Sequence, residues 1–182
     1  MTLTTVLAAH EPTDDKERAD LAAMSSFASS LARPFSREQQ PAHFTGSAVV
    51  VTPDGARVCL VLHAKLGRWL QPGGHADAAD GGLMENTALR EAREETGCEV
   101  VLHATAPRPL DVDVHVIPKR KTEPEHRHLD VRYLVVAKDP AALLHDPDES
   151  HGAQWLSWDE ALARADEGPL RRLLEKARRW CR

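Results

Sequence analysis

The sequence predicts an α/β fold: a mixed β-sheet with helices on both of its faces, preceded by a helical extension at the N-terminus. Two observations indicate this class. Short runs rich in β-branched residues are separated by turn residues, as in antiparallel hairpins. Between and after these runs, other segments carry apolar residues at helical spacing. The chain has 182 residues, of which 42% are hydrophobic and 28% charged, and this composition suits a globular domain with its own core.

The first expected element is a helix over residues 14–32, in which apolar residues recur at helical spacing and which Pro34 ends. After a short polar linker the composition changes and becomes β-rich. We therefore expect two parts, a helical extension over residues 1–40 and a main domain over residues 41–182. The sequence leaves open whether the extension covers the sheet or forms the contact of a homodimer.

The main domain begins with β-rich runs on either side of a turn with the sequence P-D-G-A-R. The expected strands cover residues 47–52, 58–63, 99–103, 111–117, 129–136 and 155–156. A helix is expected over residues 83–96, with Gly97 as its C-terminal stop. Ser157 and Glu160 match a capping box that opens another helix, and a last helix is expected over residues 170–180.

The charge and the cysteines limit the class of partner. With 23 basic and 28 acidic residues the net charge is −5, whereas nucleic-acid-binding proteins usually have a basic excess. We expect a small-molecule ligand and no nucleic-acid polymer. The three cysteines form no C-x-x-C pair, which indicates reduced thiols. No secretion signal or membrane-spanning run is recognised, so we expect a cytoplasmic protein without a membrane partner.

Three glutamates gather on one expected helix, in the stretch R-E-A-R-E-E-T-G over residues 90–97. At about 100° per residue, Glu91, Glu94 and Glu95 lie within one arc of this helix, beside an apolar side. Stacked like charges destabilise a helix by about 0.2–0.5 kcal/mol per pair. Either Arg90 offsets them on a solvated face, or they bind a divalent cation such as Mg²⁺, which prefers carboxylate oxygens.

The glutamates follow the turn Pro72-Gly73-Gly74, and the two features together resemble the box of the Nudix hydrolases, G-x5-E-x7-R-E-u-x-E-E-x-G-u, where u is a bulky aliphatic residue. The resemblance covers residues 44–158. It implies a Nudix-type α/β/α sandwich and a Mg²⁺-dependent hydrolase, with Mn²⁺ as the second candidate metal. The implied substrate is a nucleoside diphosphate linked to another moiety, cleaved at its diphosphate by attack of water on phosphorus.

The resemblance also implies roles for individual residues. It assigns four metal ligands, namely Gly73 through its carbonyl, Glu91, Glu94 and Glu95. Arg90, which we place in the catalytic set, matches the arginine that holds the box together. Glu149 resembles a further carboxylate that some family members place shortly before a tryptophan, here Trp155. Glu149 is read as a ligand, a general base or a solvated acid, and the proton of the attacking water is expected to go to Glu95, Glu91 or Glu149.

The loop between the turn and the helix departs from the family pattern. The interval from Gly74 to Arg90 is two residues longer than in the pattern, and Gly82 stands where a glutamate normally orients the arginine. Asp80 or Glu85 could replace that glutamate, and the sequence does not distinguish between them.

The chain has ten histidines, and several alternate with other residues along expected strands. The stretches D-V-D-V-H over residues 111–115 and H-R-H-L-D over residues 126–130 each put polar side chains on one face of a strand. If the two strands pair, the result is a histidine-rich surface, which is a substrate wall, a second metal site or a solvent-facing side of the sheet. The residues expected to bind substrate are His75, Arg68, His126, His128 and Arg132.

Two other functions remain alternatives to hydrolysis, because one fold can host several activities. The first is an isomerase acting on an allylic diphosphate, which would release no phosphate. The second is a non-catalytic nucleotide-sensing module. The retained glutamates argue against the sensing module, because a pure binder does not need a complete metal cage.

Overall fold

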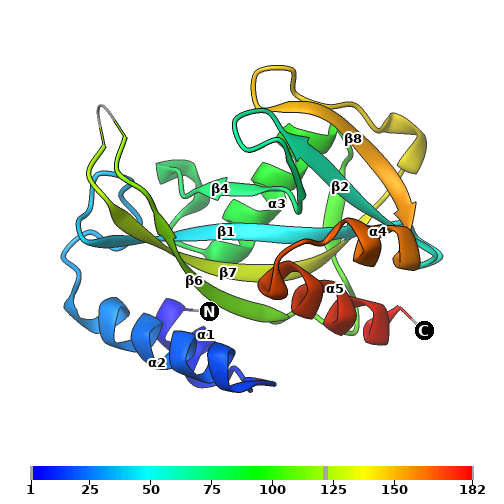
Figure 1. The fold of residues 1–182 in the computed structure, drawn as a ribbon. Helices are drawn as coiled ribbons and strands as arrows, with labels where there is room; N and C mark the ends of the chain where they lie inside the picture. The colour runs from blue at the N-terminus through cyan, green and yellow to red at the C-terminus, as the bar shows by residue number, and fades with distance from the viewer. Residues whose placement is uncertain (1, 121–122, 182) are drawn as a thin grey trace.

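The structure of the chain is a computed structural model that describes residues 2–120 and 123–181 (Figure 1). Its helices are α1 (Leu3–Ala8), α2 (Asp15–Ser30), α3 (Met84–Thr96), α4 (Trp158–Arg164) and α5 (Gly168–Trp180). Its strands are β1 (Ala42–Val51), β2 (Arg57–His63), β3 (Arg68–Leu70), β4 (Gly73–His75), β5 (Val100–Leu102), β6 (Asp111–Ile117), β7 (His126–Ala137) and β8 (Ser150–Ser157). Short 3₁₀ turns at Ala78–Asp80 and Pro140–Ala142 precede α3 and β8. No described helix combines the length and the apolar character that crossing a lipid bilayer requires.

The strands of the described residues join into one mixed sheet with β1 and β7 at its centre. These two strands run parallel, in register from Ala42 opposite Arg127 to Val51 opposite Val136. β6 and β5 pair antiparallel with β7, whereas β4 and β2 pair antiparallel with β1. β2 also carries β3 and β8 as antiparallel neighbours. The long parallel pair β1 and β7 is thus flanked on both sides by antiparallel strands.

Helices cover both faces of this sheet. α3 packs on β1 and β7 from one side, and α5 and α4 lie on the other side, in front of the sheet in Figure 1. One apolar cluster lies around α3 and a second lies beneath α4 and α5. The predicted α/β/α class with a mixed sheet is therefore confirmed.

Gly46 in β1 sets how closely α3 approaches the sheet. A Cβ atom at this position would lie 2.9 Å from the carbonyl oxygen of Met84 and 2.9 Å from the Cβ atom of Thr87. α3 ends at Gly97, whose φ of 66° is a left-handed conformation that favours glycine, as the sequence predicted. The glutamate-bearing side of α3 is thereby held against β4.

The N-terminal helices belong to the same packed structure as the sheet. Val6 of α1 and Met24 of α2 are buried in the apolar cluster that surrounds α3. α2 lies along β6 (Figure 1), and Lys16 donates a hydrogen bond to Asp113 of that strand at 2.6 Å. The extension predicted over residues 1–40 thus contributes to the core, with its long helix close to the predicted position.

Candidate active site

Arg90, near the middle of α3, holds the loop and the helix together. Each N–H of its guanidinium points at an oxygen atom. The acceptors are Asp80 Oδ1 (3.1 Å), Asp80 Oδ2 (3.0 Å), the His75 carbonyl (2.7 Å), Glu91 Oε1 (3.0 Å) and Glu94 Oε2 (2.8 Å). A guanidinium has no further N–H to offer a substrate phosphate. This geometry agrees with the role that the resemblance implies for Arg90, which is to hold the box together.

Asp80 replaces the glutamate that the family pattern places before this arginine. Its side chain is buried and also accepts hydrogen bonds from the Asp77 backbone N–H (2.8 Å) and the Thr87 hydroxyl (2.9 Å). Burial acts to raise the pKa of Asp80, but the hydrogen bonds from Arg90, Asp77 and Thr87 outweigh it and lower the pKa. Glu85, the other candidate, accepts a hydrogen bond from the β7 tyrosine at 3.4 Å instead. The loop is longer than in the family pattern, and an aspartate, Asp80, takes the place of the glutamate as the partner of Arg90.

Three carboxylates from distant parts of the chain converge beside this arginine. Glu91 and Glu95 of α3 and Glu149, just before β8, each offer an oxygen atom, and these atoms lie within 4.8 Å of one another. The Gly73 N–H donates a hydrogen bond to Glu95 Oε1 at 2.6 Å, which fixes α3 to β4. The Ala64 N–H donates to the Glu149 carbonyl at 2.9 Å, beside the pairing of β2 with β8. The turn, the helix and the later loop thus form one carboxylate cluster, Glu91, Glu95 and Glu149.

Burial makes the negative charge of this cluster costly. Desolvation raises the pKa of Glu91 to about 7 although Arg90 opposes the shift, and it raises the pKa of Glu95 to about 8, with Glu149 adding repulsion. When all three carboxylates are ionised, their negative charge exceeds the positive charge of the neighbouring guanidinium, and a bound cation would offset the excess. Such a set of oxygen donors fits a hard divalent cation like Mg²⁺.

Two other predicted metal ligands, Glu94 and Gly73, lie next to this cluster without contributing a side-chain oxygen to it. The Glu94 side chain is 53% exposed and is paired with Arg90, one helical turn away, so it lies outside the described carboxylate cluster. The Gly73 N–H contacts the cluster through its hydrogen bond to Glu95, and the predicted role of the Gly73 carbonyl as a metal ligand stays a prediction. Glu149, which the sequence left open as a solvated acid, belongs to the cluster while remaining exposed.

The face of the sheet turned toward α5 carries rows of polar side chains across β1, β7 and β6. The strand register aligns His43 with His128 and His115, Thr45 with Asp130 and Asp113, and Ser47 with Arg132 and Asp111. His75 of β4 pairs with Thr45, and its ring centroid lies 5.1 Å from that of His43. The two alternating stretches do pair, so the condition for a histidine-rich surface is met, and most of the resulting face is buried.

Arg132 lies inside this polar face. It is 4% exposed and donates hydrogen bonds to Asp130 (2.8 Å), Asp113 (3.1 Å) and Asp111 (3.4 Å). Arg172 of α5 donates to Asp111 at 2.7 Å, so the network joins α5 to the sheet. This corrects the expectation that Arg132 contacts substrate, because its guanidinium is buried among aspartates.

Two further residues expected at the substrate have other partners. Arg68 donates to Asp166 at 2.9 and 2.7 Å and also to Glu167, in the connection between α4 and α5. His126 is buried, and its Nδ1 atom lies 2.9 Å from the Pro124 carbonyl. These contacts give both residues a role in the fold.

His75 and His128 are the two half-buried histidines of the expected substrate set. Burial lowers the pKa of His75 to about 4, and burial together with the surrounding histidines lowers the pKa of His128 further. Both rings are therefore neutral at pH 7. Neutral imidazoles are poor anchors for a phosphate but good metal ligands.

Comparison with known proteins agrees with this geometry. Residues 42–177 match the family profile described as the NUDIX domain. The chain belongs to the Nudix family. The predicted family is thus confirmed, together with its enzyme class, a hydrolase acting on diphosphate bonds.

Several solved Nudix structures share the fold. A C. elegans Ap4A hydrolase binary complex is 19% identical, with a TM-score of 0.56 over 73% of this chain and 93% of that one. A NUDIX-family hydrolase from Clostridium perfringens is 25% identical, with a TM-score of 0.53 over 76% and 95%. The E. coli dihydroneopterin triphosphate pyrophosphohydrolase is 14% identical, with a TM-score of 0.54 over 73% and 92%. No curated protein matches the sequence.

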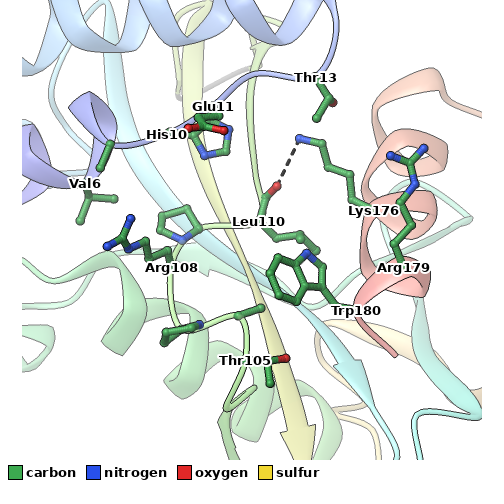
Figure 2. Close-up of a pocket in the computed structure, with 14 residues that line it drawn as sticks. Val6, His10, Glu11, Thr13, Thr105, Arg108, Leu110, Lys176, Arg179 and Trp180 are labelled. Atoms are coloured by element: carbon green, nitrogen blue, oxygen red, sulfur yellow. Dashed lines mark hydrogen bonds between the residues drawn. The ribbon is translucent and has the colours of Figure 1, made fainter. Parts of the chain in front are cut away.

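A cavity of about 480 Å³ lies elsewhere in this Nudix chain, between α1, the segment before β6 and α5 (Figure 2). Val6 and Trp180 are among its apolar lining residues, and Arg108 and Arg179 are among the charged ones. Lys176 also lines the cavity, and its ammonium donates a hydrogen bond to the Leu110 carbonyl at 3.2 Å (Figure 2). The residues of the carboxylate cluster are not part of this lining, so the cavity is separate from the Nudix box.

The Nudix turn offers a test of how closely Glu91 is positioned. A Cβ atom on Gly74 would lie 2.7 Å from the Glu91 carboxylate, so Gly74→Ala is expected to displace that side chain without disrupting the backbone. We expect kcat to fall by roughly 10–100-fold, the usual effect of disturbing the surroundings of a metal ligand. Gly152→Ala is the matched control, since a Cβ atom there meets no atom within 4 Å. Equal kcat values for the two variants would contradict the placement of Glu91.

The raised pKa of Glu95 predicts a pH dependence of stability. The folded-state pKa of Glu95 is about 8, above the ordinary 4.5, so the folded state holds the proton more tightly than the unfolded state. The contribution of this proton to the free energy of unfolding is fully present below pH 4.5 and is lost as pH rises through 8. Glu95→Gln removes this titration. In the presence of a chelator, we expect the difference in Tm, variant minus wild type, to increase from acidic pH to pH 8. When Mg²⁺ is added in place of the chelator, we expect this difference to decrease. Parallel pH curves for the two proteins would contradict the prediction.

Proposed function

We propose that this Nudix chain is a Mg²⁺-dependent pyrophosphohydrolase that cleaves a nucleoside diphosphate linked to another moiety. The observation that carries the proposal is the carboxylate cluster of Glu91, Glu95 and Glu149 against the Gly73-Gly74 turn. Two structures with the same fold are named as an Ap4A hydrolase and a dihydroneopterin triphosphate pyrophosphohydrolase, and these names support hydrolysis of a polyphosphate linkage as the reaction type.

The carboxylate cluster would hold the metal ion, Mg²⁺ or in its place Mn²⁺. When bound, the ion neutralises diphosphate oxygens and lowers the pKa of a coordinated water. Glu91 and Glu95 are buried and fixed by Arg90 and Gly73, so they are suited to be its constant ligands. Their rigidity reduces the reorganisation that the reaction requires.

Glu149 is the best placed acceptor for the proton of the attacking water. Its side chain is exposed, so water reaches it, while its oxygen lies within 4.8 Å of the oxygens of Glu91 and Glu95. A carboxylate in this position takes the proton at the moment the water attacks phosphorus. Asp80 and Arg90 act at a distance by keeping Glu91 and the turn in place.

The setting of the protein supports a cytoplasmic role. Cys59 and Cys98 are buried free thiols and Cys181 is a half-buried one, as expected in a reducing compartment. The acidic net charge of −5 favours a small phosphorylated substrate over a nucleic-acid polymer.

A hydrolysis screen tests the proposal. The purified chain is incubated in ¹⁸O-water with dinucleoside polyphosphates, nucleotide sugars, nucleoside triphosphates and allylic diphosphates, with and without Mg²⁺. We expect Mg²⁺-dependent release of a nucleoside monophosphate or phosphate, with ¹⁸O in one phosphorus-containing product. Conversion of an allylic diphosphate without phosphate release would instead support an isomerase. Saturable nucleotide binding without turnover of any compound would support a sensing module.

A further inference from the structure

Three histidines from separate strands converge on the face of the sheet opposite α3. His43 lies on β1, His75 on β4 and His128 on β7, and each offers a ring nitrogen within 4.8 Å of the other two. The ring centroids are 5.1 Å apart for His43 and His75, and 4.9 Å apart for the other two pairs. Strand register brings them together, so the arrangement is built into the sheet.

The hydrogen-bond partners identify which nitrogen of His43 carries the proton. Its Nδ1 atom lies 3.4 Å from the Gln39 carbonyl, which can only accept, so Nδ1 is the donor and Nε2 presents a lone pair. Within the described structure the buried Nε2 atoms of His43 and of His128 have no hydrogen-bond partner. Buried polar atoms are normally paired, so these two nitrogens call for a ligand.

The lone pair on Nε2 of His43 selects a cation as the ligand. A phosphate oxygen accepts hydrogen bonds, so it cannot bind a nitrogen that presents only a lone pair. Such a nitrogen can, however, coordinate a metal ion. An imidazole that donates its other ring N–H to a carbonyl, as His43 does, has the usual surroundings of a metal ligand. Nitrogen donors favour ions such as Zn²⁺ over Mg²⁺, which takes oxygen.

We propose that His43, His75 and His128 form a second metal site, which binds a divalent transition-metal ion of the imidazole-preferring class such as Zn²⁺. Three protein ligands leave a coordination position for water or a substrate oxygen. The rings of His115 and His126 lie 5.3 and 5.2 Å from that of His128 and border the site.

This site is distinct from the carboxylate cluster. Gly74 faces the Glu91 carboxylate, and successive residues of a strand point to opposite faces, so His75 faces away from it. The His75 carbonyl nevertheless accepts a hydrogen bond from Arg90 at 2.7 Å, which joins the two sites through one strand. The proposal therefore goes beyond the hydrolase function and can fail independently of it.

Metal binding to the full chain tests the proposal directly. Chelator-treated protein is dialysed against micromolar Zn²⁺ in an excess of Mg²⁺, and bound zinc is counted by elemental analysis. We expect one equivalent of Zn²⁺ in wild type and in the Glu91→Gln/Glu95→Gln variant, but none in the His75→Gln/His128→Gln variant. His151→Gln, at an exposed histidine of β8, is the matched control and is expected to keep the equivalent.

X-ray absorption of zinc-loaded wild type provides a measurement that needs no variant. We expect imidazole nitrogens at about 2.0 Å from the metal. The proposal is overturned if wild type binds no zinc, if the histidine variant keeps its full equivalent, or if the absorption spectrum shows carboxylate oxygens without imidazole. If His75→Gln/His128→Gln does not fold, His75→Gln alone and the wild-type spectrum decide.

Discussion

Replacing Glu95 with glutamine is expected to lower kcat by roughly 10²- to 10⁴-fold, because metal stabilisation of phosphoryl-transfer charge is worth several kcal/mol and each 1.36 kcal/mol is tenfold in rate. Glutamine keeps an oxygen that can accept the Gly73 N–H, so the fold is expected to persist. Steady-state kinetics across a Mg²⁺ titration, on the substrate found by the screen, measure both kcat and the apparent metal affinity.

Two further glutamate variants separate a ligand from a proton acceptor. Glu99→Gln, at an exposed position just after α3, is the matched control and is expected to leave kcat and Mg²⁺ dependence unchanged. Glu149→Gln is expected to lower kcat with less change in Mg²⁺ dependence than Glu95→Gln. Wild-type kinetics in Glu95→Gln would show that the carboxylate cluster is not the catalytic metal site.

Removing the buried ammonium of Lys176 is expected to lower the free energy of unfolding by about 3–5 kcal/mol, because it leaves the buried Glu17 carboxylate without its ammonium partner. Lys176 is 7% exposed, contacts the fully buried Glu17 and lies 2.9 Å from Asp111 Oδ2. Burial acts to raise the pKa of Glu17, but hydrogen bonds from His10 and Lys176 lower it well below its usual range. Urea unfolding of Lys176→Ala at pH 7 measures the loss.

A second cation of the same helix provides the comparison for this prediction. Arg178 pairs with Asp159 at 2.9 Å, and the aspartate side chain is 85% exposed. Arg178→Ala is expected to cost about 0–1 kcal/mol, as for other surface ion pairs. If Lys176→Ala cost no more than Arg178→Ala, the buried network would not be what joins α5 to α2.

The parts of the fold that were predictable are those whose signal is local. The periodicity of residues 84–96 and the glycine after them define α3, and the capping box at Ser157 and Glu160 opens α4 as expected. β8 begins at Ser150, well before the expected residues 155–156, because pairing with β2 rather than intrinsic propensity makes that stretch a strand. Neither α1 nor the short β3 and β4 carries a periodic pattern long enough to be recognised.

The candidate site shows the same division between local and distant information. Glu91 and Glu95 were recognised because they share one helical arc, but the choice between Asp80 and Glu85 depends on how the loop folds back onto Arg90. His43 was missed, although His43, Thr45 and Ser47 alternate along β1 in the same way as the recognised stretch over residues 111–115. Which alternating stretches become neighbours is decided by the sheet order, and no short sequence window contains that order.

The contact between α2 and α5 also orders the events of biosynthesis. Glu17 and Lys176 are 159 positions apart in the sequence. During translation, α2 is therefore made long before Lys176, whose ammonium pairs with the Glu17 carboxylate. Until α5 leaves the ribosome, the Glu17 carboxylate lacks the ammonium of Lys176, and burying it without this partner is unfavourable. The docking of α5 against α2 is therefore expected to be a late step of folding that the pairing of the central strands precedes.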